Sequence, residues 1–143
     1  MEALYTAIAK AEAGGRNGHV ETTDGLLKFD LSVPKGLQGP GLPGKTNPEQ
    51  LFACGYSACF AGAIDAAARQ KKHILKTITV IAEVSIGKNT ESKFQLAVEL
   101  KIYLPDLKQA EAEALARDAH QICPYSRATR GNVEVKLTII DKA

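Results

Sequence analysis

The stretch NPEQLFACGYSACFAGAIDAAARQ, residues 47–70, decides the fold because it predicts one long helix. Asn47 is a good helix N-cap, Pro48 suits a first helical turn, and Gln50 completes the spacing of a capping box. We therefore expect the helix to begin at Asn47 and to run to about Lys72.

The first half of this helix is apolar on every side. No charge occurs from Leu51 to Ile64, and Ala and Gly are frequent. A helix that is apolar all round is buried all round, but this run is shorter than the ~20 residues of a membrane span. One subunit of 143 residues can hardly surround it. We expect the helix to pack against its copy in a homodimer, where Gly55 and Gly62 would allow close backbone approach.

Strand patterns lie on both sides of the helix. Upstream, His19–Val33 has a hairpin pattern with a turn at Asp24-Gly25, and a Gly- and Pro-rich loop, Pro34–Asn47, follows it. Downstream, two alternating strands flank the loop GKNTES, an amphipathic helix runs from Leu107 to about Ile122, and a last alternating strand follows. The residues that share a face of each strand are Ile78, Val80, Ala82, Val84 and Ile86; Phe94, Leu96, Val98, Leu100, Ile102 and Leu104; and Val133, Val135, Leu137 and Ile139.

The predicted order of elements is ββ-α-ββ-α-β. Hairpins outnumber crossovers in this order, which is typical of an α+β fold with mostly antiparallel sheet around a long buried central helix. The first hairpin is too small to fold alone, so the Gly- and Pro-rich loop is interpreted as a surface loop. The sequence therefore predicts a single domain over residues 1–143.

Composition and charge exclude several classes of protein. Apolar residues make up 45% and charged residues 24% of the chain, which is a globular composition. The net charge of +2 is too small to indicate nucleic-acid binding. The N-terminal residues have no basic region followed by an apolar block, so no secretory signal is predicted. We expect a soluble, cytoplasmic protein with no nucleic-acid or membrane partner.

Three cysteines in a reducing compartment do not predict a structural disulfide framework. Cys54 and Cys59 lie five residues apart on the predicted helix, a rotation of roughly 140°, so they point to different sides. Cys123 lies at a helix end, where a loop can move. A cysteine on an apolar helix is usually inert, and burial raises its pKa. A reactive Cys59 would need a cation from elsewhere in the chain, because it is too far from the N-terminus of the helix.

Two short motifs near the C-terminus could indicate a glutaredoxin or a zinc site, but their context supports neither. The tetrapeptide Cys123-Pro124-Tyr125-Ser126 resembles a monothiol glutaredoxin motif, but here it follows a helix near the C-terminus instead of opening one near the N-terminus. The spacing of His120 and Cys123 could be half of a zinc site, but no second half follows. We expect no metal and no bound cofactor.

The chain resembles the organic hydroperoxide resistance (Ohr) proteins of the Ohr/OsmC family over nearly its full length. The residues that carry the resemblance are Leu4-Tyr5-Thr6-Ala7, Gly14-Gly15-Arg16-Asn17-Gly18, Asp24-Gly25, Asn47–Phe60, Cys123-Pro124-Tyr125-Ser126 and Asn132-Val133. The resemblance implies an OsmC-like intertwined homodimer. It also implies a peroxidase that reduces alkyl and fatty-acid hydroperoxides and is recycled by dihydrolipoyl groups on a lipoylated protein.

The resemblance places four residues in the site. Cys59 corresponds to the attacking (peroxidatic) cysteine, Cys123 to its resolving cysteine, Arg16 to the active-site arginine, and Glu49 to the glutamate that holds this arginine. Cys54 is a departure, because the family usually has a small apolar residue there. Alternative interpretations are a non-catalytic redox sensor and a structural dimer with inert thiols.

Helix geometry adds one hypothesis about this site. Ten residues separate Glu49 from Cys59, which is roughly 15 Å along a helix, so we do not expect one guanidinium to reach both along one helix. Either the chain around Glu49 is not yet helical, or Glu49 comes from the partner subunit. If two copies of the helix cross antiparallel near Cys54 and Gly55, Glu49 of one copy lies near Cys59 of the other. We therefore expect a site shared across the dimer interface.

Overall fold

A computed structural model describes all residues, 1–143, and shows an α+β fold. The chain forms two compact units, Met1–Leu51 and Phe52–Ala143, and the boundary falls inside the long helix α1. Each unit contains one three-stranded sheet. The elements are β1 (Ala9–Glu12), a 3-10 turn (Gly15–Asn17), β2 (His19–Thr22), β3 (Lys28–Asp30), a second 3-10 turn (Lys35–Leu37), α1 (Pro48–Gln70), β4 (Thr79–Lys88), β5 (Phe94–Tyr103), α2 (Gln109–Ile122), α3 (Pro124–Thr129) and β6 (Glu134–Ile139).

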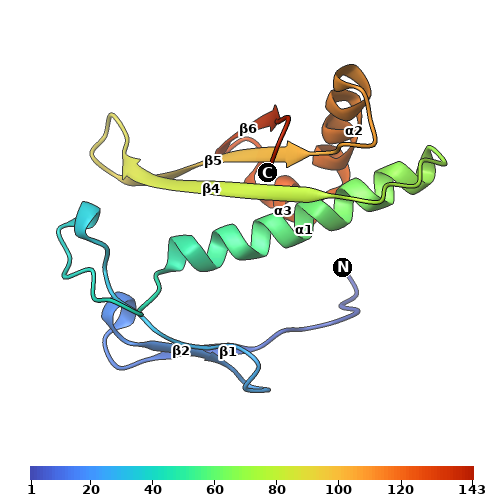
Figure 1. The fold of residues 1–143 in the computed structure, drawn as a ribbon. Helices are drawn as coiled ribbons and strands as arrows, with labels where there is room; N and C mark the ends of the chain where they lie inside the picture. Colours follow the sequence, from blue (N-terminus) through green and yellow to red (C-terminus); the bar gives the residue numbers. More distant parts are fainter. The chain divides into compact units, whose positions relative to one another are not determined.

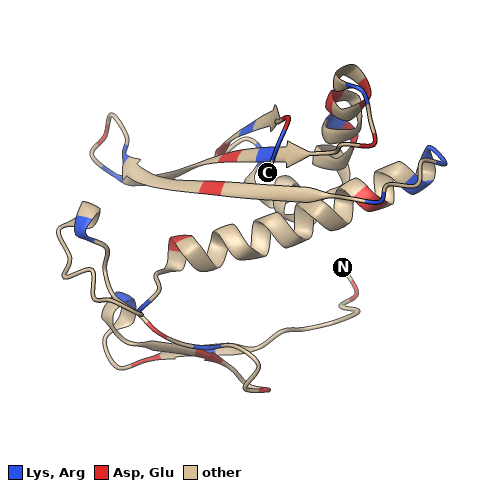
Figure 2. Cartoon of the chain, viewed as in Figure 1, with Lys and Arg blue, Asp and Glu red and all other residues tan.

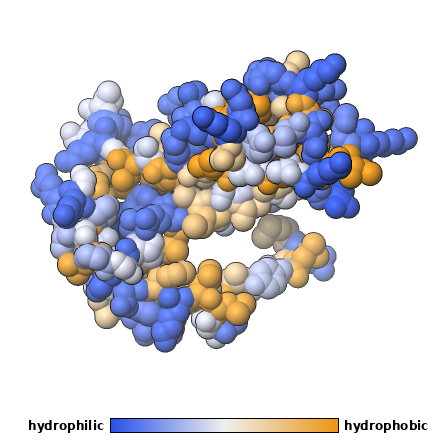
Figure 3. All heavy atoms as spheres, viewed as in Figure 1, coloured by the Kyte–Doolittle hydropathy of each residue, from blue (hydrophilic) through white to orange (hydrophobic).

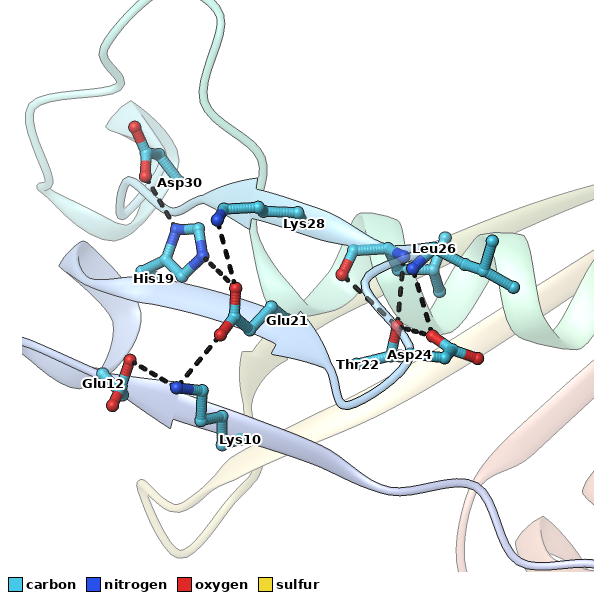
Figure 4. Close-up of polar contacts among 10 residues, drawn as sticks. Lys10, Glu12, His19, Glu21, Thr22, Asp24, Leu26, Lys28 and Asp30 are labelled. Carbon is cyan, nitrogen blue, oxygen red and sulfur yellow. Dashed lines mark hydrogen bonds and ion pairs between the residues drawn. The ribbon is translucent and has the colours of Figure 1, made fainter.

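The sheet of the N-terminal unit is antiparallel, in the order β1-β2-β3. Its two faces differ, because side chains alternate along each strand. The cross-strand set Ala11, Val20 and Phe29 lies on one face. The opposite face carries three cross-strand ion pairs or hydrogen bonds, which Figure 4 shows. They join Lys10 to Glu21 at 3.0 Å, Lys28 to Glu21 at 3.4 Å, and His19 to Asp30 at 2.9 Å.

Helix α1 begins as its sequence predicts. The Asn47 side chain accepts a hydrogen bond from the Gln50 backbone N–H at 2.9 Å, so Asn47 is the N-cap. The Gln50 side chain does not complete the capping box; it accepts from the Thr46 hydroxyl at 2.6 Å instead. The helix ends at Gln70, and Lys72 adopts a left-handed conformation with φ 60°. A residue in this conformation commonly terminates a helix.

The sheet of the C-terminal unit has the order β4-β5-β6. The β4–β5 pair is a long antiparallel hairpin, and β6 returns parallel to β5 after α2 and α3. Figure 1 shows α1 running along this sheet. The apolar positions of α1, β5 and α2 form the core, and its largest fully buried side chains include Tyr56, Phe60, Ile64, Leu100 and Ile102.

Most of the sequence predictions about the fold are confirmed, and two elements are new. The α+β class, the long helix and the mostly antiparallel pairing are as expected. Strand β1 and the short helix α3 extend the predicted order, which had neither. The single-domain organisation over residues 1–143 stays a prediction.

Helix α1 is not buried all round within one chain. It carries no charge between Glu49 and Asp65, as Figure 2 shows. Its residues Cys54, Ala58, Gly62 and Ala66 are nonetheless exposed. They recur every four residues and form one exposed stripe of small side chains, and Figure 3 shows weakly apolar atoms reaching the surface along α1. By length and composition alone α1 could cross a membrane, but the core helix of a water-soluble protein passes the same test.

Candidate functional site

The thiols of Cys59 and Cys123 lie in contact in the C-terminal unit. Their sulfur atoms are 3.5 Å apart, in hydrogen-bond contact, and both cysteines are free. Cys59 lies in the middle of α1 and is partly buried, whereas Cys123 is fully buried. A disulfide needs sulfur atoms about 2.05 Å apart, so a small movement of either side chain would bring the pair to bonding distance.

Cys123 occupies this place because Pro124 breaks the helical path. A residue that precedes proline is disfavoured in the α conformation, and Cys123 has φ −60° and ψ 122°. It therefore ends α2 and caps α3, in which Pro124 takes the first position. The sequence predicted the helix end but not the burial, since a loop was expected after it.

The surroundings of Cys59 disfavour its thiolate. Burial raises the pKa of the Cys59 thiol, and the adjacent Cys123 thiol adds to the rise. The backbone N–H of Tyr125 opposes both effects and lowers the pKa. The net shift is upward, so a reactive thiolate here needs a further positive charge.

A cluster of buried hydroxyl groups lies one helical turn from the two cysteines. The Tyr56 hydroxyl is 2.9 Å from the Ser126 hydroxyl and 3.3 Å from the Thr129 hydroxyl. Tyr56 and Ser126 are fully buried. The Thr129 hydroxyl also donates to the Tyr125 carbonyl at 3.0 Å. This cluster links α1 to α3, and sequence reasoning missed it because its members are about seventy residues apart.

The Tyr125 ring packs on α1 beside this cluster. Its centroid lies 5.8 Å from the Tyr56 ring and 6.2 Å from the Phe52 ring. A Cβ atom added at Gly55 would lie 3.1 Å from the Tyr125 hydroxyl oxygen, so a larger residue here would require the Tyr125 ring to shift by a few tenths of an ångström.

Arg16 and Glu49 form an ion pair in the N-terminal unit. One terminal nitrogen of Arg16, Nη2, donates to both carboxylate oxygens of Glu49, at 2.7 and 2.5 Å. This geometry differs from a two-nitrogen fork, and it leaves Nε and Nη1 for other acceptors. The Glu49 side chain is 12% exposed and that of Arg16 is 40% exposed, so the cation is the accessible partner.

Glycines shape the loop that holds Arg16. Gly14 has φ 115° and Gly15 has φ 56°, in the left-handed region that favours glycine. A Cβ atom at Gly18 would lie 2.0 Å from the Glu12 carbonyl oxygen. The Asn17 side chain anchors the turn by accepting from the Val33 backbone N–H at 2.9 Å. The GGRNG motif therefore forms an anchored turn that presents the arginine.

The remaining candidate residues lie apart from these pairs. Cys54 is exposed on α1. The ring of His120 is 6.4 Å from that of Phe60, and its buried Nδ1 has no hydrogen-bond partner. No three His, Cys, Asp or Glu side chains converge in a group that could hold a metal ion.

Comparison with known proteins identifies the family. The family described as OsmC-like protein matches residues 39–138. The organic hydroperoxide resistance protein of Xanthomonas axonopodis pv. citri (strain 306) is 48% identical over 137 residues, covering 95% of this chain and 94% of that one.

Two solved structures are similar over almost the whole chain. An organic hydroperoxide resistance protein from Legionella pneumophila is 55% identical, with a TM-score of 0.89, covering 96% of this chain and 98% of that one. A protein of the same description from Vibrio cholerae, with captopril bound in one of its active sites, is 45% identical, with a TM-score of 0.87, covering 97% and 94%. This chain therefore belongs to the OsmC-like protein family, among the organic hydroperoxide resistance proteins.

Proposed function

We propose that this protein is a cysteine-based peroxidase that protects the cell against organic hydroperoxides. The observation that carries the proposal is the contact between the Cys59 and Cys123 sulfur atoms at 3.5 Å. Two free thiols at this distance can pass between dithiol and disulfide with little rearrangement. The names of the relatives support the substrate class, since they are described as organic hydroperoxide resistance proteins.

In the proposed reaction the Cys59 thiolate attacks the distal oxygen of the hydroperoxide. The O–O bond breaks, Cys59 becomes a sulfenic acid, and the alkoxide takes a proton and leaves as an alcohol. The Cys123 thiol then attacks the sulfenic sulfur, and water leaves as the disulfide forms. An external dithiol resets the protein by two thiol–disulfide exchanges. We propose a lipoylated protein as this reductant, with no bound cofactor.

Arg16 is the proposed source of the positive charge that Cys59 needs. Burial and the Cys123 thiol raise the pKa of Cys59, and a guanidinium beside the sulfur would lower it. The same fork can donate to the peroxide oxygens and stabilise the leaving alkoxide. Glu49 engages only Nη2 of Arg16, so the other nitrogens of the guanidinium are free for these roles.

We propose that the working form is an intertwined homodimer. The exposed stripe Cys54, Ala58, Gly62 and Ala66 would allow two α1 helices to pack closely. Glu49 and Cys59 are separated by roughly 15 Å along α1, because each residue adds 1.5 Å to a helix. In an antiparallel crossing, the Arg16–Glu49 pair of one subunit would serve Cys59 of the partner subunit. The proposed location of this dimer is the cytoplasm.

The experiment that tests the function measures consumption of cumene hydroperoxide by the pure protein with dihydrolipoamide. Parallel reactions contain glutathione in place of dihydrolipoamide, or hydrogen peroxide in place of the organic peroxide. We expect fast turnover only with dihydrolipoamide and the organic peroxide, and none with Cys59→Ser. Turnover that persists in Cys59→Ser would exclude Cys59 as the attacking group. A wild-type protein that forms the disulfide but never turns over would be a redox sensor.

A further inference from the structure

We propose that Tyr56 is a positioning residue for the disulfide step, acting through the buried Ser126 hydroxyl to hold Cys123 against Cys59. The inference rests on the proposed function for its biological meaning. The Tyr56–Ser126 hydrogen bond sets how readily the sulfur atoms of Cys59 and Cys123 react with each other.

Two contacts join the same pair of segments, one turn apart. Tyr56 precedes Cys59 by three residues on α1, and Ser126 follows Cys123 by three residues at the start of α3. Tyr56 and Cys59 lie on the same face of α1, because they are three residues apart on one helix, whereas Cys123 is the residue that caps α3. The sulfur contact of 3.5 Å and the hydroxyl contact of 2.9 Å therefore form parallel cross-links between the two segments. The hydrogen bond between the two hydroxyls therefore restrains the distance between the two sulfur atoms.

The hydrogen bond between the Tyr56 and Ser126 hydroxyls is specific because neither hydroxyl can bond to water instead. Tyr56 and Ser126 are fully buried, so a hydroxyl that lost its partner would remain without one. One arrangement of protons satisfies all three hydroxyls: Ser126 donates to Tyr56, Tyr56 to Thr129, and Thr129 to the Tyr125 carbonyl. This chain ties α1 to the backbone of the segment that carries Cys123.

The restraint has a chemical consequence for a sulfenic acid at Cys59. The sulfenic acid either condenses with the Cys123 thiol, releasing water, or reacts with a second hydroperoxide to form sulfinic acid and an alcohol. The first path is intramolecular, so its rate follows the effective concentration of Cys123 at Cys59. Any loosening of the segment lowers this concentration and favours overoxidation.

The first test measures the Cys59–Cys123 disulfide in a glutathione redox buffer, which gives the effective concentration directly and needs no peroxidase activity. Tyr56→Phe keeps the ring and removes the hydroxyl. We expect the effective concentration to fall about five- to tenfold, the size of effect that one buried hydrogen bond has. Tyr103→Phe is the matched control, because Tyr103 lies at the end of β5 and its hydroxyl has no partner in the chain.

Ser126→Ala and the double variant separate positioning from general loss of stability. If the two hydroxyls act as one link, Ser126→Ala reproduces the effect and the double variant is no worse than either single variant. Additive losses in the double variant, or an unchanged effective concentration in folded Tyr56→Phe, would overturn the proposal. Circular dichroism confirms that each variant is folded.

The second test counts sulfinic acid at Cys59 by mass spectrometry after exposure to excess cumene hydroperoxide. Tyr56→Phe should raise the sulfinic fraction about five- to tenfold at equal peroxide dose. A protein that fails to reduce hydroperoxides at all would refute the proposed function, but it would leave the result of the glutathione measurement intact. The two failures are therefore distinguishable.

Discussion

The N-terminal unit, Met1–Leu51, and the C-terminal unit, Phe52–Ala143, bury their residues to very different extents. In the first unit the only buried residues are Gly18, Leu31 and Ser32, and the faces of its sheet remain open. The second unit has a continuous apolar core around α1. The proposed chemistry is divided in the same way: the paired thiols lie in the packed unit, and the ion-paired arginine lies in the open one.

This difference suggests why each part of the site is where it is. A thiol pair needs a fixed distance, and a packed core holds distances well. A cation must stay charged, and an open polar surface keeps it hydrated until it is needed. The prediction with the largest effect tests the packing directly.

Phe60→Ala should destabilise the protein by about 3–5 kcal/mol, because Phe60 is fully buried and its loss leaves a cavity. Leu26→Ala in the N-terminal unit is the matched truncation at an exposed site and should change the free energy of unfolding by about 0.5 kcal/mol or less. Urea unfolding of both variants measures the difference. Equal losses would mean that the two units are packed to a similar degree.

The second prediction concerns the charge that the open unit supplies. Arg16→Ala should lower the rate with cumene hydroperoxide by about 10²–10³-fold, the usual effect of removing one charge-stabilising donor. It should also raise the pH at which iodoacetamide alkylates Cys59. Stability should hardly change, since the Arg16–Glu49 pair is partly exposed.

Two variants control for this effect. Lys28→Ala removes an exposed lysine from the same unit and should leave the rate and the alkylation profile as they are. Arg16→Lys keeps a charge but loses the planar fork, so only part of the rate should return. A full rate in Arg16→Ala would assign the stabilisation of the thiolate to another group.

Periodicity explains why the packed unit was the easier one to predict. The uncharged run in α1 and the alternation in β4 and β5 are strong signals, and all three elements form close to the expected bounds. Strand β1 was missed because its sequence, AKAE, contains residues that are depleted in strands. Its pairing with β2 comes from the sheet and not from local preference.

The candidate site was predictable only in part, for a different physical reason. The resemblance indicated Cys59 and Cys123, and the structure brings them together. The Tyr56–Ser126 hydrogen bond joins residues seventy positions apart, and neither residue type predicts it. The only local signal is that Ser126 follows Cys123 at helical spacing.

The third prediction concerns a partly buried histidine of the packed C-terminal unit. Burial, and then the nearby charge of Arg130, lowers the pKa of His120 below its ordinary value of 6.5. As the pH falls, the unfolded chain therefore binds a proton at His120 before the folded chain does. His120 should thus lower the free energy of unfolding as the pH falls below about 6.5. Unfolding in urea between about pH 7.5 and 5.5 should show a shallower pH dependence in His120→Gln than in the wild type.

His73→Gln is the control, since His73 lies outside the core, just beyond the end of α1. It should keep the pH dependence of the wild type. If the free energy of unfolding depended on pH identically in the wild type and in His120→Gln, the unpartnered ring of His120 would be freely hydrated.

The smallest expected effect belongs to the charged face of the N-terminal sheet. Hydrogen bonds from Lys10 and Lys28 lower the pKa of Glu21 from 4.5 to about 2. The stability that Glu21 contributes is therefore present above about pH 4.5 and is lost as the pH falls through about 2. Because the network is solvent-exposed, salt should screen it, and NMR titration in about 1 M NaCl should move the pKa back toward 4.5. A Glu21 pKa that stays near 2 in high salt would show that this face is sheltered from solvent, as it would be if a second subunit covered it.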